Sequence, residues 1–142
     1  MMKINLISLN VVKEKKIEYQ ASIDCTADAT EVFKKLIGGR DRECMAVITL
    51  NNQNTLNSVE IVSIGTLKGM NICIREMFKA AILQNAQSIM ICHNHPSGTL
   101  EPSDEDIYFT RKVREAGELL GINLIDHILL ADGRSKSLMG YL

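Results

Sequence analysis

Three short, mostly apolar runs place the strongest constraint on the fold of this chain. Each is too short for a typical helix but long enough for a strand that is buried in the middle of a sheet. Strands that are apolar on both sides need cover from both sides. The sequence therefore predicts a central sheet with helices packed on it. The runs are CMAVITL at 44–50, SIMIC at 88–92 and NLIDHILLA at 123–131.

Two elements are expected before the first of these runs. Residues 1–22 are interpreted as an N-terminal strand ribbon, in which Ile17, Tyr19 and Ala21 alternate as one buried face requires. Thr26 can cap a following helix, whose apolar positions fall on one stripe and which a pair of glycines ends. The glycines are Gly38 and Gly39, and the stripe holds Ala29, Val32, Phe33, Leu36 and Ile37.

Turn and helix signals join the apolar runs to one another. The polar turn NNQN leads from the run at 44–50 into a second strand at 58–66, and these two strands should pair antiparallel. Helical spacing follows from about Ile72 to Ala86. The buried face of that helix is expected to hold Ile74, Met77, Phe78, Ala81 and Ile82.

A helix with clear end signals lies before the third run. Ser103 and, three residues later, Asp106 form a capping-box signature at its start, and Gly121 ends it after about Leu120. The third run leads through the turn ADGRS into a short final strand at 135–142. Because neighbouring strands are joined both by tight turns and by helices, the fold class is a mixed α+β or α/β one, with a mixed sheet flanked by helices.

Length and composition fit one soluble domain. With 142 residues, of which 46% are hydrophobic and 23% charged, the chain can bury a single core, expected at residues 23–142. No apolar run reaches the roughly 20 residues that cross a bilayer, and no secretory signal is evident, so a cytoplasmic protein without membrane association is expected. Four scattered cysteines fit buried, reduced thiols. The net charge of −1 argues against strong nonspecific DNA binding.

The stretch ICHNHPSGTLEPSDEDI, at residues 91–107, contains candidate metal ligands. In an extended segment, side chains two residues apart point to the same side, so His93 and His95 can converge at the end of a strand. A proline and a glycine then turn the chain, which can return with Asp106 at the start of the next helix. Two imidazoles and one carboxylate suit zinc and leave the fourth tetrahedral position open, as in catalytic zinc sites.

A catalytic zinc site also needs a carboxylate that is not a metal ligand, to deprotonate water and protonate the leaving group. Candidates are Glu43, at the start of the first apolar run, and the acids near the histidines. Each of these residues also has a structural interpretation. A His pair on a strand is often structural, Ser103 and Asp106 are fully explained as helix-capping residues, and Glu43 alone is typical of a solvated charge.

Together these residues resemble a known motif. HNHPSG followed by SDED is similar to the JAMM metal motif of the JAB1/MPN metalloprotease fold, in the variant of the bacterial RadC family. Further segments look like family segments in family order, so the resemblance covers about residues 20–142. It implies a JAB1/MPN-like fold with a layering similar to that of cytidine deaminases. The further segments are DRECMAVITLNNQN, IVSIGTL, IREMFKAAI and LLGINLIDHILLADG.

The resemblance also implies roles for single residues. The ligands of Zn2+ would be His93, His95 and Asp106. Glu43 would be the general acid/base, because it precedes an apolar strand as the family's glutamate does, and it is preferred over the acids near the histidines. Ser103 would assist the tetrahedral intermediate.

Two features qualify this reading of the chain. Asp126 and His127 lie in a segment that the family shares, and we interpret them as support for the core or for the metal ligands. Full-length RadC-like proteins carry an N-terminal helix-hairpin-helix region associated with DNA, where this chain has the predicted ribbon. That difference weakens the link to DNA repair.

Two functions therefore compete. The first is a JAMM-type zinc metallohydrolase that attacks a peptide or isopeptide carbonyl of an unidentified protein or peptide substrate. The alternative is a non-enzymatic module in DNA-repair or mobile-element complexes. An HNH nuclease is disfavoured because the three letters are consecutive here, and a zinc deaminase because its H-x-E and P-C-x-x-C strings are absent.

Overall fold

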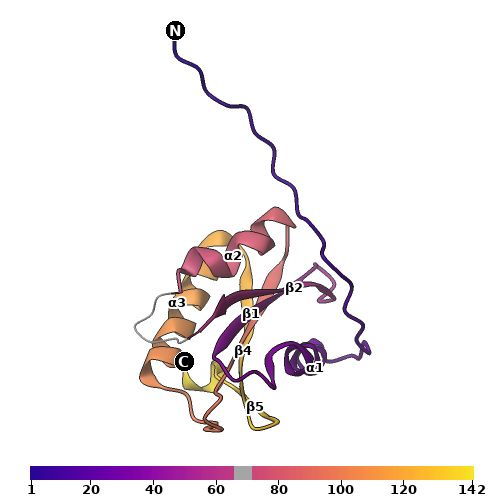
Figure 1. Cartoon of the computed structure of the whole chain (residues 1–142), viewed down its shortest axis with the longest axis vertical. Coiled ribbons are helices and arrows are strands. Elements are labelled where there is room, and N and C mark those ends of the chain that lie inside the picture. Colours follow the sequence, from indigo (N-terminus) through magenta and orange to yellow (C-terminus); the bar gives the residue numbers. More distant parts are fainter. Residues whose placement is uncertain (66–71) are drawn as a thin grey trace.

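The three apolar runs form the middle of a five-stranded sheet in the computed structural model, which describes residues 1–65 and 72–142 (Figure 1). The strand order is β2-β1-β3-β4-β5. β3 and β4 pair parallel and the other neighbours pair antiparallel, which confirms the predicted mixed sheet and its first antiparallel pair. The strands are β1 (Cys44–Leu50), β2 (Leu56–Ile64), β3 (Ser88–Asn94), β4 (Asn123–Ala131) and β5 (Arg134–Ser137).

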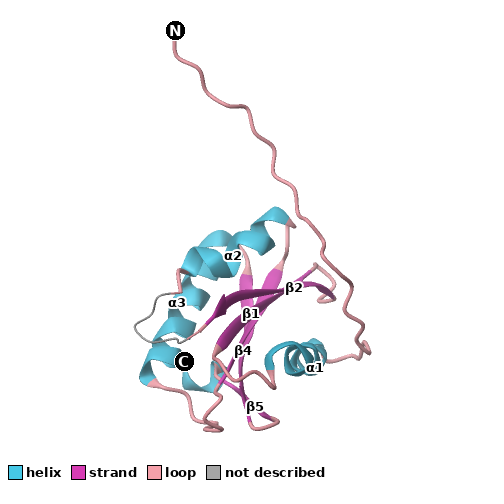
Figure 2. Cartoon of the chain, viewed as in Figure 1, coloured by secondary structure: helices cyan, strands magenta, loops and turns pink. Residues whose placement is uncertain are grey.

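Helices cover both faces of this sheet (Figure 2). α1 packs on one face, whereas α2 and α3 pack on the other, so the chain forms three layers. This arrangement confirms the predicted mixed α+β fold class with a sheet flanked by helices. The helices are α1 (Cys25–Ile37), α2 (Ile74–Leu83), α3 (Asp104–Leu120) and a short 3-10 helix, η1 (Met139–Tyr141).

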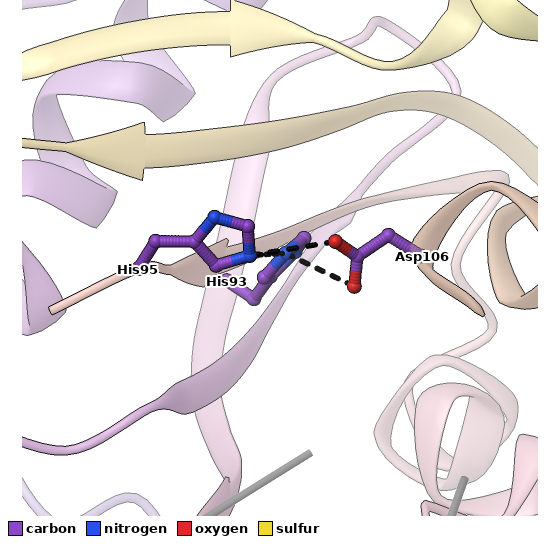
Figure 3. Close-up of side chains that lie close together, drawn as sticks. All are labelled: His93, His95 and Asp106. Carbon is purple, nitrogen blue, oxygen red and sulfur yellow. Dashed lines mark hydrogen bonds and ion pairs between the residues drawn. The ribbon is translucent and has the colours of Figure 1, made fainter. Parts of the chain in front are cut away.

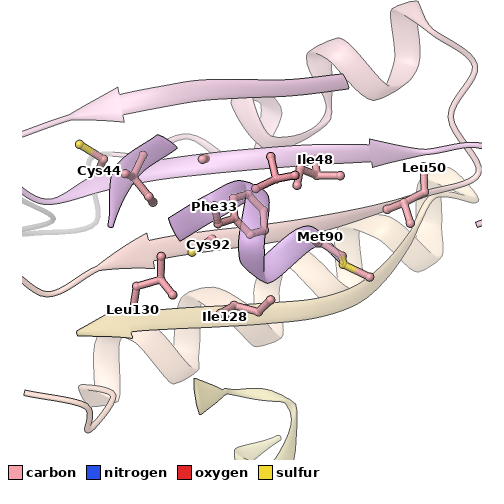
Figure 4. Packing of buried hydrophobic residues seen from close by; sticks show 12 residues of the cluster. Phe33, Cys44, Ile48, Leu50, Met90, Cys92, Ile128 and Leu130 are labelled. Atoms are coloured by element: carbon pink, nitrogen blue, oxygen red, sulfur yellow. The ribbon is translucent and has the colours of Figure 1, made fainter. Parts of the chain in front are cut away.

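The core on the α1 side is built from alternate residues of β1 and β3 (Figure 4). Ile48 and Leu50 of β1 lie in one cluster with Met90 and Cys92 of β3 and with Phe33 of α1. None of these five side chains is more than 1% exposed. Because burying a large apolar side chain stabilises a fold by about 1.5–3 kcal/mol, this cluster is a major source of stability.

The core on the α2 and α3 side uses the intervening residues of the same strands. Met45 of β1 and Ile91 of β3 lie in a second cluster with Phe78 of α2 and Val113 of α3. His93 comes two residues after Ile91, and side chains alternate along a strand. The alternation of β3 therefore directs His93 toward α3.

The capping prediction is confirmed for α3 and wrong for α1. Ser103 is the N-cap of α3 and forms a capping box with Asp106, and Gly121 ends the helix with a φ of 71°. In α1 the N-cap is Asp24, whose carboxylate accepts a hydrogen bond from the backbone N–H of Thr26 at 3.0 Å. Thr26 therefore lies inside the first turn, because the aspartate two residues earlier already satisfies its N–H group.

Two other element boundaries differ from the predictions. α2 is shorter than expected, because Asn85 adopts a φ of 53° and turns the chain toward β3. Ile82 is 53% exposed, so its assignment to the buried face was wrong. The final strand ends at Ser137 and is followed by η1 instead of continuing to residue 142. The last residue of the strand predicted at 58–66 lies outside the described residues.

The ribbon predicted for residues 1–22 is not formed. The structure assigns no strand there, and residues 1–16 run as an exposed, extended chain away from the body (Figure 1). Ile17 and Tyr19 are partly buried against the α1-side core, but Ala21 is exposed. A two-stranded hairpin without a third strand is marginal in water, and no strand of the described residues pairs with this segment.

Two further predictions concern the cysteines and membrane association. All four cysteines are free, and Cys44 and Cys92 are buried as predicted. Cys73 is exposed and Cys25 is half-buried, so the prediction of buried thiols was wrong for these two. Among the residues that the structure describes, no helix combines the length and the apolar character needed to cross a membrane.

Candidate metal centre

The end of β3 and the start of α3 bring His93, His95 and Asp106 together (Figure 3). His93 lies near the end of β3, where it pairs with Leu129 of β4. The backbone N–H of His95 donates to the carbonyl of Leu130, which keeps the segment extended beside β4. Gly98 then takes a φ of 84° and reverses the chain toward α3. A residue with a Cβ adopts that conformation only with strain, so the glycine suits the return to Asp106.

The side-chain atoms of these three residues converge on one point. The two Nε2 atoms of His93 and His95 lie 3.1 Å apart, and each is 3.4 Å from one carboxylate oxygen of Asp106. The candidate ligand atoms of the group all lie within 4.8 Å of one another. His93 is fully buried and Asp106 is 8% exposed. This group could hold a metal ion.

The hydrogen bonds around His95 favour a cation at that point. Its Nδ1 lies 2.9 Å from the carbonyl oxygen of Thr99, and a carbonyl can only accept, so Nδ1 carries a proton. Nε2 faces His93 and Asp106, so it offers a lone pair when the ring is neutral and donates to Asp106 when the ring is protonated. An imidazole lone pair beside a carboxylate is an arrangement that a cation stabilises, so the residues present fit a metal.

The charges in the group point the same way. Burial alone would raise the pKa of the Asp106 carboxyl, but hydrogen bonds from His93 and His95 outweigh burial and hold that pKa well below its usual value. The hydrogen bond to Asp106 raises the pKa of His95, whereas burial lowers it. The Thr99 carbonyl and the charge of Glu43 also raise this pKa. The site therefore favours positive charge, whether from a proton or from a metal ion.

Ser103 and Asp106 keep the structural role that the sequence also indicated. The backbone N–H of Ser103 donates to Asp106 Oδ2 at 2.9 Å, and the backbone N–H of Asp106 donates to Ser103 Oγ at 3.1 Å. This capping box fixes the carboxylate in the orientation that faces both histidines. The capping and metal-binding interpretations of Asp106 are therefore compatible. Ser103 is exposed beside the group, and its hydroxyl accepts within the box.

Glu43 lies at the same end of the sheet. It directly precedes β1 and is half-buried, and its carbonyl accepts from the backbone N–H of Gly65 at 2.8 Å. β1 and β3 pair antiparallel with Met45 opposite His93, so Glu43, just before β1, and His95, just after β3, lie at the same end of the sheet on neighbouring strands. Its negative charge contributes to the raised pKa of His95, which is a second sign of proximity.

Comparison with known proteins identifies the family. The model of the RadC-like JAB domain matches residues 23–141 of this chain. The chain belongs to the RadC-like JAB domain family. The resemblance seen in the sequence is thereby confirmed.

Full-length relatives have similar sequences over one part of their length. A UPF0758 protein of Desulforamulus reducens is 40% identical over 121 residues, which make up 85% of this chain and 53% of that protein. A UPF0758 protein of Caldanaerobacter subterraneus subsp. tengcongensis is 45% identical over 117 residues, or 82% of this chain and 50% of that protein. The chain spans about half the length of the curated relatives it matches.

In this RadC-like JAB domain, the side chain of Asn94 forms hydrogen bonds to the segment that carries Glu43. Its side chain points away from the histidines that flank it, and its Oδ1 accepts from the backbone N–H of Cys44 at 2.7 Å. Its Nδ2 donates to the carbonyls of Arg42 at 2.9 Å and Arg40 at 3.4 Å. Asn94 thus bonds to the residue on each side of Glu43. Sequence reasoning gave this asparagine no role, although its place within the His-x-His motif was visible.

The buried residues behind His93 were also missed in part. His93 Nδ1 lies 2.7 Å from His127 Nε2, and His127 Nδ1 lies 2.6 Å from Thr110 Oγ1. Thr110 comes one helical turn after Asp106, which is the only sequence signal for it. Asp126 faces the α1 side and accepts from Ser137 Oγ at 2.6 Å. The predicted pair therefore separates, because neighbouring residues of a strand point to opposite faces.

Proposed function

We propose that this domain is a zinc-dependent hydrolase of the JAMM class that cleaves peptide or isopeptide bonds. The observation that carries the proposal is the convergence of His93, His95 and Asp106, with Glu43 at the same sheet end. Two nitrogen ligands and one carboxylate leave a position for water in the tetrahedral geometry of zinc. Membership of the RadC-like JAB domain family supports the same conclusion.

The residues divide the chemistry as follows. Zinc, when bound, supplies a Lewis acid that polarises a carbonyl and makes water acidic enough to react near neutral pH. Glu43 takes one proton from the attacking water as its oxygen bonds to the carbonyl carbon. Glu43 then gives that proton to the nitrogen as the C–N bond breaks, so that a carboxylic acid and an amine leave. The hydroxyl of Ser103 donates to the carbonyl oxygen as negative charge develops there.

The burial of these residues sets the direction of substrate approach. His93 is fully buried, whereas His95 and Glu43 are partly exposed and Ser103 is exposed. A backbone or side-chain amide can therefore approach from the side of Ser103 and Glu43, while the sheet closes the opposite side. We infer a protein or peptide substrate, because the site lies at the surface instead of in a deep pocket.

The second candidate is a non-enzymatic module in DNA-repair or mobile-element complexes. Family membership favours it, since the matched segment makes up only about half of the curated relatives, which leaves room in them for a DNA-binding region beside this domain. The net charge of −1 argues against direct DNA contact by this chain.

Metal analysis and turnover distinguish the two candidates. Purified protein loaded with Zn2+ should hold one zinc ion per chain, and the His93→Ala variant should hold none. The zinc form should cleave a fluorogenic isopeptide or peptide library, and a chelator should abolish the cleavage. Stoichiometric zinc without any cleavage, combined with salt-dependent DNA binding, would favour the second candidate. A wild-type protein that holds no zinc after loading would refute the first candidate, the zinc-dependent hydrolase.

A further inference from the structure

A chain of three buried hydrogen bonds runs from His93 back to the main chain of Asp106. His93 contacts His127, His127 contacts Thr110, and Thr110 Oγ1 lies 2.6 Å from the carbonyl oxygen of Asp106. The side chains of His93, His127 and Thr110 are fully buried. No water competes for these groups in such a position, so each proton has a defined place.

Counting protons fixes the direction of every bond in the chain. The hydroxyl of Thr110 has one proton, and the carbonyl of Asp106 can only accept, so that proton lies between them. Thr110 Oγ1 must then accept from Nδ1–H of His127. The opposite direction would leave two oxygen atoms 2.6 Å apart without a proton between them.

The next step concerns the two histidine rings. His127 is fully buried, and its two ring nitrogens contact Thr110 and His93 instead of a carboxylate. A positive charge on this ring would therefore be buried without a hydrogen-bonded counter-charge, so the ring is neutral. A neutral ring with its proton on Nδ1 has a lone pair on Nε2. That lone pair can accept only from Nδ1–H of His93, which lies 2.7 Å away. The proton of His93 is therefore on Nδ1.

We infer that His127 and Thr110 are positioning residues that fix the ring tautomer and orientation of His93, so that its Nε2 lone pair faces the metal. This inference deepens the proposed zinc site and rests on it. Asp106 closes the arrangement, because its carboxylate faces His93 directly and its carbonyl ends the hydrogen-bond chain. The first turn of α3 thus controls one ligand and orients another.

A merely structural role for His127 would give a different outcome in solution. Packing alone requires a side chain of suitable volume, whereas positioning requires an acceptor opposite Nδ1 of His93. The partners that orient ligating histidines typically contribute 10- to 100-fold to metal affinity. Acceptor chemistry and volume can be separated by substitution.

The variants follow from that distinction. In His127→Gln, the amide oxygen can accept from Nδ1–H of His93. In His127→Leu, no acceptor remains. Thr110→Val removes the hydroxyl and keeps the shape, whereas Thr110→Ser keeps the hydroxyl. Asp126→Asn is the matched control, because Asp126 neighbours His127 in β4 but faces the α1 side.

Two measurements test the inference. Long-range 15N–1H NMR of the metal-free wild-type protein should show the His93 ring protonated at Nδ1, and zinc affinity should be measured by chelator competition. His127→Leu and Thr110→Val should weaken zinc binding about 10- to 100-fold, while His127→Gln, Thr110→Ser and Asp126→Asn stay close to wild type.

Three results would overturn the inference. The first is a wild-type His93 ring without a proton on Nδ1. The second is a folded His127→Leu variant with wild-type zinc affinity, and the third is an equal loss in His127→Gln and His127→Leu. If His127→Leu fails to fold, the Thr110 pair and the wild-type NMR spectrum decide. If the wild-type protein binds no zinc, the proposed function fails, but the NMR spectrum still reports the His93 tautomer.

Discussion

The side chains of β3 that point to one face of the central sheet differ in character from those that point to the other face. On the α1 face, β3 contributes Met90 and Cys92 to a dry cluster (Figure 4). On the α3 face, Ile91 lies in an equally apolar cluster, but the next residue of that face is His93, which belongs to the candidate metal centre. The end of β3 therefore couples an apolar core to a polar site through alternation alone.

Alternate residues of one strand therefore serve different purposes: those that face α1 stabilise the fold, and those at the end of the other face form the candidate metal centre. Substitutions on the α1 face should change the free energy of unfolding and leave the metal group intact. Substitutions at the polar end of the α3 face should change metal binding or turnover at similar stability. The following predictions test that separation, from the largest expected effect to the smallest.

Glu43→Gln should give the largest change on the polar side. Removing the proposed proton carrier should lower turnover about 100- to 10,000-fold, while zinc content and the melting temperature stay close to wild type. Glu101→Gln is the matched control, because Glu101 is exposed and paired with Lys136 at 2.6 Å instead of facing the histidines. Initial rates with an isopeptide substrate measure the effect. Equal loss in both variants would contradict the assignment of Glu43.

Phe33→Ala should give the largest change on the α1 face. Phe33 is fully buried in the dry cluster, so its truncation should cost about 3–5 kcal/mol in the free energy of unfolding. Urea titration measures this loss. Zinc affinity, measured at low temperature where the variant is folded, should stay within about threefold of wild type, well under 1.4 kcal/mol. A larger loss of affinity would mean that the two faces are not independent.

Asn94→Ala should affect both properties, because Asn94 joins the two regions. Its loss leaves the buried N–H of Cys44 without its acceptor, which should cost about 1–3 kcal/mol of stability. It also releases the segment of Glu43, so turnover should fall more than zinc affinity does. Asn51→Ala is the control, since Asn51 accepts from Gln53 and Thr55 at the far end of β1. That variant should lose stability without a loss of turnover per folded molecule.

The stability of the metal-free protein should fall as the pH drops below about 6.5. Burial lowers the pKa of His127 in the folded chain, so below that pH the unfolded chain takes up a proton that the folded chain does not. The raised pKa of His95 acts in the opposite sense, and its contribution is lost as the pH rises through the folded value. Urea titrations with chelator across this range measure the balance. In His127→Gln the fall should disappear, and its persistence would assign it to another group.

Much of the fold was predictable from local signals. The bounds of β1 and β4 match the apolar runs, and α3 runs from Asp104 to Leu120 between the predicted caps Ser103 and Gly121. Such signals are local because a cap or a turn satisfies backbone groups within a few residues. The ribbon predicted at residues 1–22 did not form, because a strand needs a neighbouring strand and no described strand pairs with this segment.

The candidate site divides in the same way. The sequence by itself determined the group of His93, His95 and Asp106, because strand alternation and a helix cap place each side chain within one short segment. Only the tertiary structure decided what stands behind that group. Asn94 meets Cys44 across 50 positions of the chain, and His127 meets His93 across 34. Proton positions depend on such distant partners, because a buried donor must find its acceptor wherever the packed elements supply one.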